Sequence, residues 1–305
     1  MNIPHIPVLL NEVKEAFLNL NEGVIIDCTL GYGGHSEALL AQNPNIKLIG
    51  CDQDEEALAF SQKRLERFTD RVSFHHGNFA SVIAKYAHLP IRGILADIGV
   101  SSLQLDKKER GFAFDSDVLD MRMNPQQELS AYDVVNHSTK EALEFILREY
   151  GEIHEYKKLA QIICEARAKA PLQSAKELSK LAEKVGGKKT IHPSTLLFQA
   201  IRIEVNNELG VLTELLESIK NANFECCIVG IISFHSLEDR IVKQTFKLWS
   251  QNCICPPSVM RCTCGNKHSL GKIISKKPIE ATHTEIKKNP RSRSAKLRVF
   301  EIKKA

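Results

Sequence analysis

Short apolar runs alternate with segments of helical spacing along the first hundred residues of the chain. The apolar runs indicate strands buried on both faces of a parallel sheet, and they cover residues 24–28, 46–51, 72–75 and 91–96. Between them, apolar positions in residues 36–41 and 55–68 recur as on one face of a helix. Repeated strand–helix units of this kind predict an α/β fold with a doubly wound, Rossmann-like sheet.

This alternation stops after Gly99, where turn residues and charges replace it up to about residue 128. A long loop of this kind is unusual unless it is functional. Helical signals follow, and strand signals return at residues 226–234, 272–275 and 295–302. We therefore expect a Rossmann-like domain made of residues 1–105 and 208–305, interrupted by an inserted helical domain at residues 106–207.

Two capping boxes mark helix starts within the expected insertion. They are Ser138-x-x-Glu141 and Ser174-x-x-Glu177, and Pro193 indicates a further helix start. No internal repeat or low-complexity tract is visible in the sequence. The insertion is accordingly expected to be wholly helical.

Composition and charge place the chain among ordinary globular proteins. Hydrophobic residues make up 43% and charged residues 26% of the 305 residues. Neither a secretory signal nor an apolar run of membrane-spanning length is present, so we expect a cytoplasmic protein that does not enter a membrane. Residues 272–305 hold eleven Lys and Arg against three Glu, which suits contact with nucleic-acid phosphates or simple solvation.

Nine cysteines divide into two groups. Five stand in apolar or helical contexts, where a free cysteine acts as a small hydrophobe: Cys28, Cys51, Cys164, Cys226 and Cys227. The other four form two C-x-C pairs, Cys253 with Cys255 and Cys262 with Cys264. Four thiols so close in sequence suit a structural zinc site, although the usual spacing is C-x₂-C.

The turn after the first strand is rich in glycine. Asp27 is followed by Gly31, Gly33 and Gly34, with His35 next to them. Glycines at such a turn let a nucleotide-like ligand approach the backbone, and an acidic residue ending the second strand, here Asp52, accepts bonds from ribose hydroxyls.

Asp97 ends the fourth strand, so three polar features share one edge of the predicted sheet. The sequence lacks a P-loop and a G-x-S-x-G elbow, which argues against an NTPase and an α/β hydrolase. A methyltransferase and an NAD-type dehydrogenase both fit the turn. An RNA-binding protein with a vestigial Rossmann-like site and a working basic tail is a third alternative.

Several separated segments of the chain resemble the bacterial RsmH (MraW) family, and the resemblance covers nearly its whole length. The matching segments are residues 5–10, 27–36, 97–104, 110–112, 119–123, 201–206, 233–240 and 289–293. The resemblance implies a class I methyltransferase fold with an inserted helical domain. It also implies that S-adenosylmethionine is used to methylate the exocyclic N4 of one cytidine at the decoding centre of small-subunit (16S) ribosomal RNA.

The resemblance further implies a set of cofactor contacts, with Phe79 lying against the adenine. They are Gly33, Gly34, His35, Asp52, Phe79, Asp97 and Gln104. The small ribosomal subunit is then the expected partner, and the chain is a monomer or a homodimer.

Methyl transfer to cytosine N4 needs a positioned amine, because its lone pair is delocalised into the ring. Asp97, or a backbone carbonyl near Ile98, would accept the N4 protons, and His235 oriented by Asp239 would take the departing proton. Both are hypotheses, and a structural role bonded to backbone is the alternative for His235.

The target base must be unstacked to enter such a pocket. Phe112 or Phe114 would stack on it, unless both serve only in packing. Arg110, Arg122 and the basic stretch 287–296 are candidates for phosphate contact, with solvation as the alternative.

Overall fold

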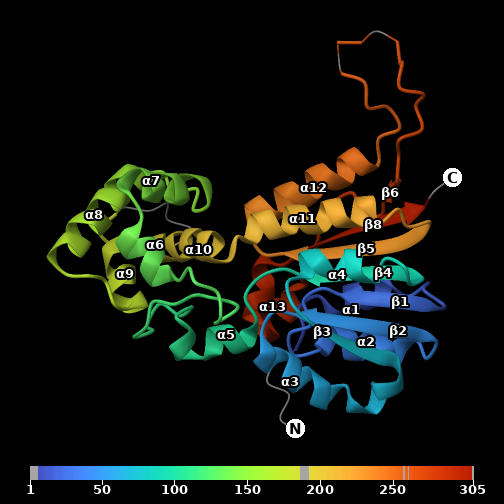
Figure 1. The fold of residues 1–305 in the computed structure, drawn as a ribbon, viewed down its shortest axis with the longest axis horizontal. Coiled ribbons are helices and arrows are strands. Elements are labelled where there is room, and N and C mark those ends of the chain that lie inside the picture. The colour runs from blue at the N-terminus through green and yellow to red at the C-terminus, as the bar shows by residue number, and fades with distance from the viewer. Residues whose placement is uncertain (1–5, 186–191, 257, 260, 304–305) are drawn as a thin grey trace. The chain divides into compact units, whose positions relative to one another are not determined.

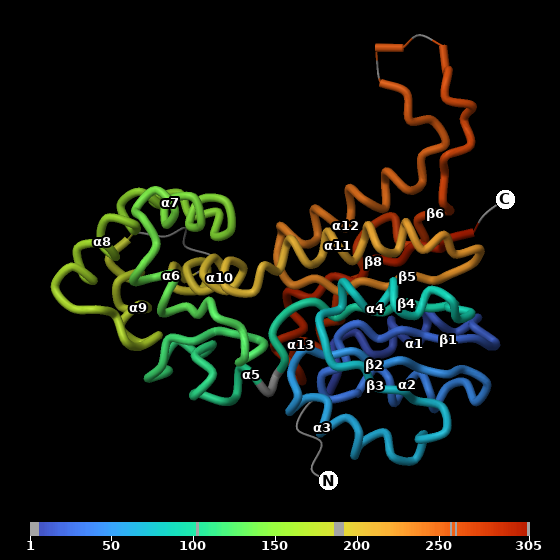
Figure 2. Tube along the Cα trace, in the orientation of Figure 1, coloured from blue at the N-terminus to red at the C-terminus, as the bar shows by residue number. Residues whose placement is uncertain are grey.

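The computed structural model describes residues 6–185, 192–256, 258–259 and 261–303. The chain divides into two compact units, one made of residues 1–99 and 211–305 and the other of residues 100–210 (Figures 1 and 2). This second unit contains the whole stretch 106–207 that the sequence predicted as an insertion and extends it at both ends. His5, which begins one of the segments that carry the family resemblance, lies outside the described residues.

The first unit contains one mixed sheet. Its strands are β1 (Gly23–Asp27), β2 (Ile46–Asp52), β3 (Val72–His76), β4 (Ile91–Asp97), β5 (Cys226–Ser233), β6 (Gly271–Ile273), β7 (Ile279–Glu280) and β8 (Lys296–Lys303). The strand order is β3-β2-β1-β4-β5-β8-β6, and β7 pairs with β8. Strands β1 to β5 run parallel, whereas β8 is antiparallel to β5, β6 and β7. The predicted α/β fold with a Rossmann-like sheet is confirmed.

Helices of the first unit cover both faces of this sheet (Figure 1). They are α1 (Leu10–Ala16), α2 (Gly34–Gln42), α3 (Glu55–Arg64), α4 (Phe79–Tyr86), α11 (Glu208–Asn221, whose first residues belong to the second unit), α12 (Ser236–Trp249) and α13 (His283–Lys288), with 3-10 turns η1 (Glu66–Arg71) and η3 (Pro290–Ser294).

Successive residues of each strand point to opposite faces of the sheet, which gives two cores. Ile25 and Leu95 pack in the core shared with α1, α2 and α3. Ile26 and Ile94 face the other core, shared with α4, α11 and α12. The apolar strand runs in the sequence therefore reflect burial on both sides.

Chain order creates a switch point between β1 and β4. From β1 the chain adds β2 and β3 on one side, then returns to add β4 and β5 on the other. In doubly wound sheets ligands bind at the carboxyl ends of the strands beside this point. Asp27 and Asp97 end these two strands.

The second unit is helical and has a core of its own. Its elements are α5 (Ser102–Asp106), η2 (Lys108–Arg110), α6 (Ala131–His137), α7 (Lys140–Glu149), α8 (Tyr156–Lys169), α9 (Ala175–Ala182) and α10 (Pro193–Asn206). The capping box predicted at Ser174 is present, and Pro193 is the first residue of α10.

The capping box predicted at Ser138 is wrong. Thr139 is the N-cap of α7, and its hydroxyl accepts the backbone N–H of Ala142. Ser138 instead ends α6, and its carbonyl oxygen accepts a hydrogen bond from Arg167 at 2.5 Å. The hydroxyl of Thr139, one residue after Ser138, thus caps the helix that the sequence predicted there.

The irregular stretch between η2 and α6 is ordered by side-chain bonds to backbone. Arg110 donates to the carbonyl oxygens of Arg122 and Met123 at 3.1 and 2.9 Å, and Arg122 forms a bidentate pair with Asp120. Phe112 is buried in the helical core, while Phe114 is 44% exposed. Arg110, Arg122 and Phe112 therefore have roles within the loop itself.

Across the described residues, no helix is both long enough and apolar enough to span a bilayer.

Candidate functional site

The carboxyl end of β1 is tied to the start of α2 through Asp27. Its buried carboxylate accepts the hydroxyl of Ser36 at 2.6 Å and the backbone N–H of Thr29 at 3.2 Å. Burial raises the pKa of Asp27 above its ordinary value. Both carboxylate oxygens of Asp27 are thus used in bonds within the protein, and these bonds hold the turn between β1 and α2.

The glycine turn brings backbone close to the site. Gly33 is the N-cap of α2 with φ +70°, a left-handed conformation that glycine adopts without strain. A Cβ on Gly34 would lie 2.3 Å from Cγ of Pro7, so no side chain fits there. The N-terminal segment carrying Pro7 is held in turn by Glu285, whose carboxylate accepts the backbone N–H of Leu9 at 2.7 Å.

Asp52 sits at the end of β2, where its two carboxylate oxygens are oriented by backbone. One accepts the N–H of Gly31 at 2.8 Å and the other that of Asp54 at 2.9 Å. Burial raises the pKa of Asp52 to about 6, against the two backbone bonds that lower it. Each oxygen keeps a second lone pair, so the carboxylate can also accept bonds from the two hydroxyls of a ribose.

His35 and Asp97 face each other across the switch point. His35 Nε2 lies 3.7 Å from Asp97 Oδ2, beyond hydrogen-bonding distance. Three buried atoms here have no hydrogen-bond partner among the described residues: both ring nitrogens of His35, and Oδ1 of Asp97. Unpaired buried polar atoms cost about 1–3 kcal/mol each. Their clustering here points to a polar ligand that satisfies them.

Thr29 holds Asp97 in this position. The backbone N–H of Asp97 donates to the Thr29 hydroxyl at 2.6 Å, joining the ends of β4 and β1. The sequence analysis missed Thr29, since a threonine after a strand carries no signal of its own. The same is true of Pro7, which only the fold places against Gly34.

Phe79 begins α4, just after the edge of the sheet that carries Asp52. The backbone N–H of Gly77 donates to the Asp52 carbonyl at 2.9 Å, so the chain turns beside Asp52 before Phe79. The Phe79 ring is half-buried and packs partly against the sheet core. Gln104 belongs to the second unit, where its side-chain oxygen accepts the N–H of Ser101 at 3.1 Å.

His235 caps helix α12. Its Nδ1 faces the backbone N–H of Glu238 at 3.4 Å, and the Glu238 carboxylate returns a bond to the His235 N–H at 3.3 Å. His235 Nε2 lies 3.2 Å from the other oxygen of the same carboxylate, without the geometry of a hydrogen bond.

The expected pairing of His235 with Asp239 is wrong. Asp239 forms a bidentate ion pair with Arg298 of β8, at 2.6 and 3.0 Å. The reason is the helix start: with His235 as N-cap, the third helical residue, Glu238, turns back to the cap, and the next residue faces β8. Glu238 was therefore the missed partner of His235.

The basic stretch 287–296 offers exposed cations on the first unit. Lys287 and Lys288 end α13, and Arg293 lies in η3; all three side chains are exposed. Asn289, between them, is buried and donates to the carbonyl of Ile6 at 3.1 Å. This stretch therefore combines an anchored backbone with cations that face solvent.

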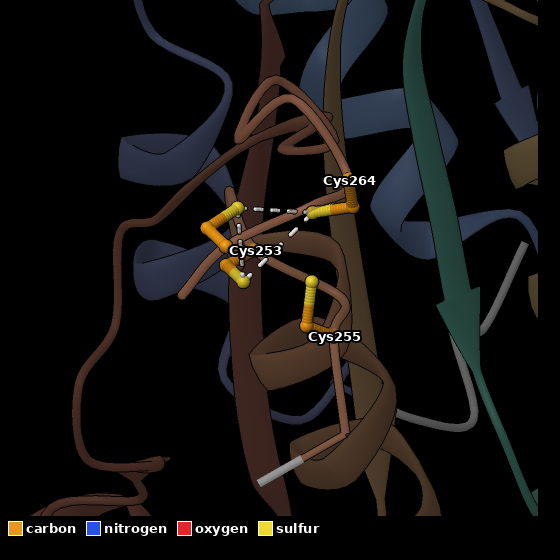
Figure 3. A group of neighbouring side chains, drawn as sticks. Cys253, Cys255 and Cys264 are labelled. Carbon is orange, nitrogen blue, oxygen red and sulfur yellow. Dashed lines mark hydrogen bonds between the residues drawn. The ribbon is translucent and has the colours of Figure 1, made fainter. Parts of the chain in front are cut away.

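The four clustered cysteines lie on the loop between α12 and β6. The sulfur of Cys253 is 3.6 Å from that of Cys262, and the sulfur of Cys264 lies 3.8 Å from that of Cys253 and 3.5 Å from that of Cys262 (Figure 3). The potential ligand atoms of all four, Cys255 included, lie within 4.8 Å of one another. The remaining five cysteines are free thiols, as the sequence predicted.

The residues beside the switch point suit an adenosyl cofactor. Asp52 has lone pairs for the hydroxyls of a ribose, and the polar atoms of His35 and Asp97 that have no partner among the described residues can bind further donors and acceptors. An antiparallel strand, β8, stands between β5 and β6 in the sheet. This fold and site are those of a Rossmann-like class I methyltransferase.

Comparison with known proteins makes the assignment specific. The chain belongs to the MraW methylase family, whose model matches residues 2–303. Proteins named "Ribosomal RNA small subunit methyltransferase H" are similar to it throughout: that of Aliarcobacter butzleri is 62% identical, covering 99% of this chain and 100% of the relative. The corresponding protein of Sulfurovum sp. is 58% identical, covering 99% of each chain, and that of Campylobacter jejuni is 57% identical, covering 98% and 97%.

Proposed function

We propose that this protein transfers a methyl group from S-adenosylmethionine to the exocyclic N4 of a cytidine at the decoding centre of small-subunit (16S) ribosomal RNA. The names of its full-length relatives support the ribosomal RNA substrate, and the family resemblance supports the base and the atom. The observation that carries the catalytic part is the cluster of unpaired buried atoms on His35 and Asp97. Ribosome assembly in the cytoplasm is the setting that such a substrate implies.

The cofactor would be held along the carboxyl edge of the sheet. Asp52 receives the ribose hydroxyls, and Phe79 lies against the adenine. The turn at Gly33, Gly34 and His35 accommodates the methionine portion, and the family resemblance adds Gln104 as a proposed contact. When bound, the cofactor would supply an electrophilic sulfonium methyl group, which passes to the nitrogen lone pair with S-adenosylhomocysteine as the leaving group.

Asp97 is the residue we assign to the amine. Its Oδ1 lacks a hydrogen-bond donor within the described chain, and the bond from its backbone N–H to Thr29 fixes the backbone from which the carboxylate extends. Accepting a hydrogen bond from N4–H localises the nitrogen lone pair and stabilises the positive charge that develops as the methyl group arrives, and the proton departs once the N–C bond has formed. Positioning of the amine supplies much of the remaining acceleration.

His235, the other catalytic candidate, is proposed to act chiefly as a helix cap. Its Nδ1 is directed at a backbone N–H, and its Nε2 faces the Glu238 carboxylate. The bond that Nδ1 accepts from the helix backbone gives the ring a structural role, while Nε2 makes no hydrogen bond among the described residues. The proton is proposed to leave through Asp97 to solvent, since the Asp97 side chain is 26% exposed.

RNA contact is proposed for the exposed cations Lys287, Lys288 and Arg293, which suit phosphate oxygens. Phe114, exposed in the second unit, is retained as the candidate for stacking on an unstacked base. Arg110 and Arg122 are less suited to phosphate, because the loop uses their guanidinium groups.

The test is methyl transfer to small subunits that lack cytidine methylation. The purified protein is incubated with methyl-labelled S-adenosylmethionine, and the labelled nucleoside is mapped. Label at cytosine N4 supports the proposal, and transfer elsewhere or none at all contradicts it.

The Asp97→Asn variant, with cofactor affinity measured separately, gives the matched comparison. We expect it to lose turnover beyond any loss of cofactor binding. Side-by-side binding of S-adenosylmethionine and NAD distinguishes the methyltransferase from the dehydrogenase alternative.

A further inference from the structure

The loop between α12 and β6 has no apolar core to hold it. From residue 251 to residue 268, no described side chain is buried, and Ile254 and Val259 are 59% and 40% exposed. Backbone bonds close its base, from His268 to the carbonyl of Asn252 at 3.1 Å and from Leu270 to that of Trp249 at 2.8 Å, and a local turn joins Val259 to the carbonyl of Pro256 at 3.0 Å. Segments without a core usually need a covalent or metal staple to keep one conformation.

Three of the four sulfurs are spaced as ligands of one tetrahedral ion, and the fourth, that of Cys255, lies within 4.8 Å of each of them. With a Zn–S distance of about 2.3 Å, adjacent sulfurs of a tetrahedral site are about 3.8 Å apart. The three mutual distances among Cys253, Cys262 and Cys264 are 3.6, 3.5 and 3.8 Å. Figure 3 shows the labelled sulfurs gathered toward one point. Disulfides join sulfurs in pairs at about 2.05 Å, whereas here three meet mutually.

The two C-x-C arms support each other in a reciprocal pattern. The backbone N–H of Ile254, the middle residue of the first arm, donates to the sulfur of Cys264 at 3.5 Å. The N–H of Thr263, the middle residue of the second arm, donates to the sulfur of Cys255 at 3.4 Å. Hydrogen bonds to ligand atoms orient them and favour the charged form that binds metal.

We propose that Cys253, Cys255, Cys262 and Cys264 bind one zinc ion that holds the α12–β6 loop in its conformation. Tetrahedral thiolate sets select zinc or iron, and zinc, which has no redox chemistry, suits thiolates that solvent reaches. The role is structural and independent of methyl transfer, because the four cysteines lie in residues 251–268, of which no described side chain belongs to the cores of the sheet.

Metal content is the direct test. The full-length protein is produced in zinc-supplemented medium and purified with reductant and without chelator, and metals are counted by inductively coupled plasma mass spectrometry. We expect one zinc per chain in the wild type and none in the double variant Cys262→Ser/Cys264→Ser. Cys164→Ser, a thiol outside the loop, is the matched control and keeps its zinc. Cobalt substitution should give the intense visible bands of a tetrahedral thiolate site.

A second readout reports the conformation of the loop. Arg261 and Lys267 are exposed, so trypsin should cut there readily in the double variant and slowly in the zinc-loaded wild type. The double variant should keep the far-ultraviolet circular dichroism of the wild type, since it removes no core contact. Metal-free wild type, iron in place of zinc, or disulfides among these cysteines under anaerobic reducing purification would each overturn the proposal. If the protein binds no zinc, the outcome of the methylation assay is unchanged. If the methylation assay fails, the zinc measurement is likewise unchanged.

Discussion

Replacing Asp52 by Asn should change protein stability in opposite directions at low and high pH. Burial raises the pKa of Asp52 from 3.8 to about 6. Ionisation is therefore less favourable in the folded protein than in the unfolded chain. The stability that the neutral carboxyl confers is complete below the unfolded pKa and is lost as pH rises through the folded one.

The magnitude follows from the size of the shift. A change of about two pK units corresponds to about 3 kcal/mol of unfolding free energy lost by the wild type between about pH 4 and pH 7. Asn does not ionise and so does not lose this stability. Its amide NH2, however, replaces one carboxylate oxygen and then faces the N–H of either Gly31 or Asp54, donor against donor. That mismatch costs about 1 kcal/mol at every pH.

We therefore expect Asp52→Asn to be about 1 kcal/mol less stable than wild type near pH 4 and about 2 kcal/mol more stable near pH 8. The assay is urea unfolding of cofactor-free protein across this range. Asp133→Asn is a control of opposite sign, because hydrogen bonds from Ser130 lower the pKa of Asp133. A variant that is destabilised equally at both ends of the range would refute the reasoning.

The same variant should bind S-adenosylmethionine more weakly, because Asn cannot accept from both ribose hydroxyls. The loss of one hydrogen bond to a charged group is about 2 kcal/mol, or about 30-fold in Kd. Isothermal titration measures it. Unchanged affinity would remove Asp52 from the cofactor site.

Three further predictions concern the packing around the site. Gly34→Ala should weaken cofactor binding at least tenfold, because its methyl group would overlap Pro7, and adding Pro7→Ala should restore part of the affinity measured by calorimetry. His235→Asn should keep turnover because Asn also caps helices, whereas a folded, cofactor-binding Asn variant without turnover would restore the histidine as proton acceptor. Asp239→Asn should lower stability by about 3 kcal/mol, because it leaves Arg298 without its charged partner, and normal turnover per folded molecule would confirm a structural role.

Local pattern in the sequence predicted most strands of the sheet and placed the candidate site at the carboxyl ends of these strands. Strands buried on both faces have to be apolar, so their runs were visible, and the glycine turn after β1 was visible because a close backbone approach excludes side chains. The irregular stretch before α6 was harder to interpret. Its order comes from bonds such as those of Arg110 to distant carbonyls, which no local pattern records.

The sequence alone determined that Asp27, Asp52 and Asp97 end strands of one sheet, because strand ends follow from hydrophobic periodicity. Only the tertiary structure separated their roles. Ser36 and burial commit Asp27 to bonds within the protein, backbone N–H groups orient Asp52, and one oxygen of Asp97 has no partner among the described residues. These differences depend on neighbours brought together by folding, as does the choice of Arg298, 59 residues away, as the partner of Asp239. Residue type and spacing specify where a polar group stands, whereas the surrounding packing specifies what it is free to bind.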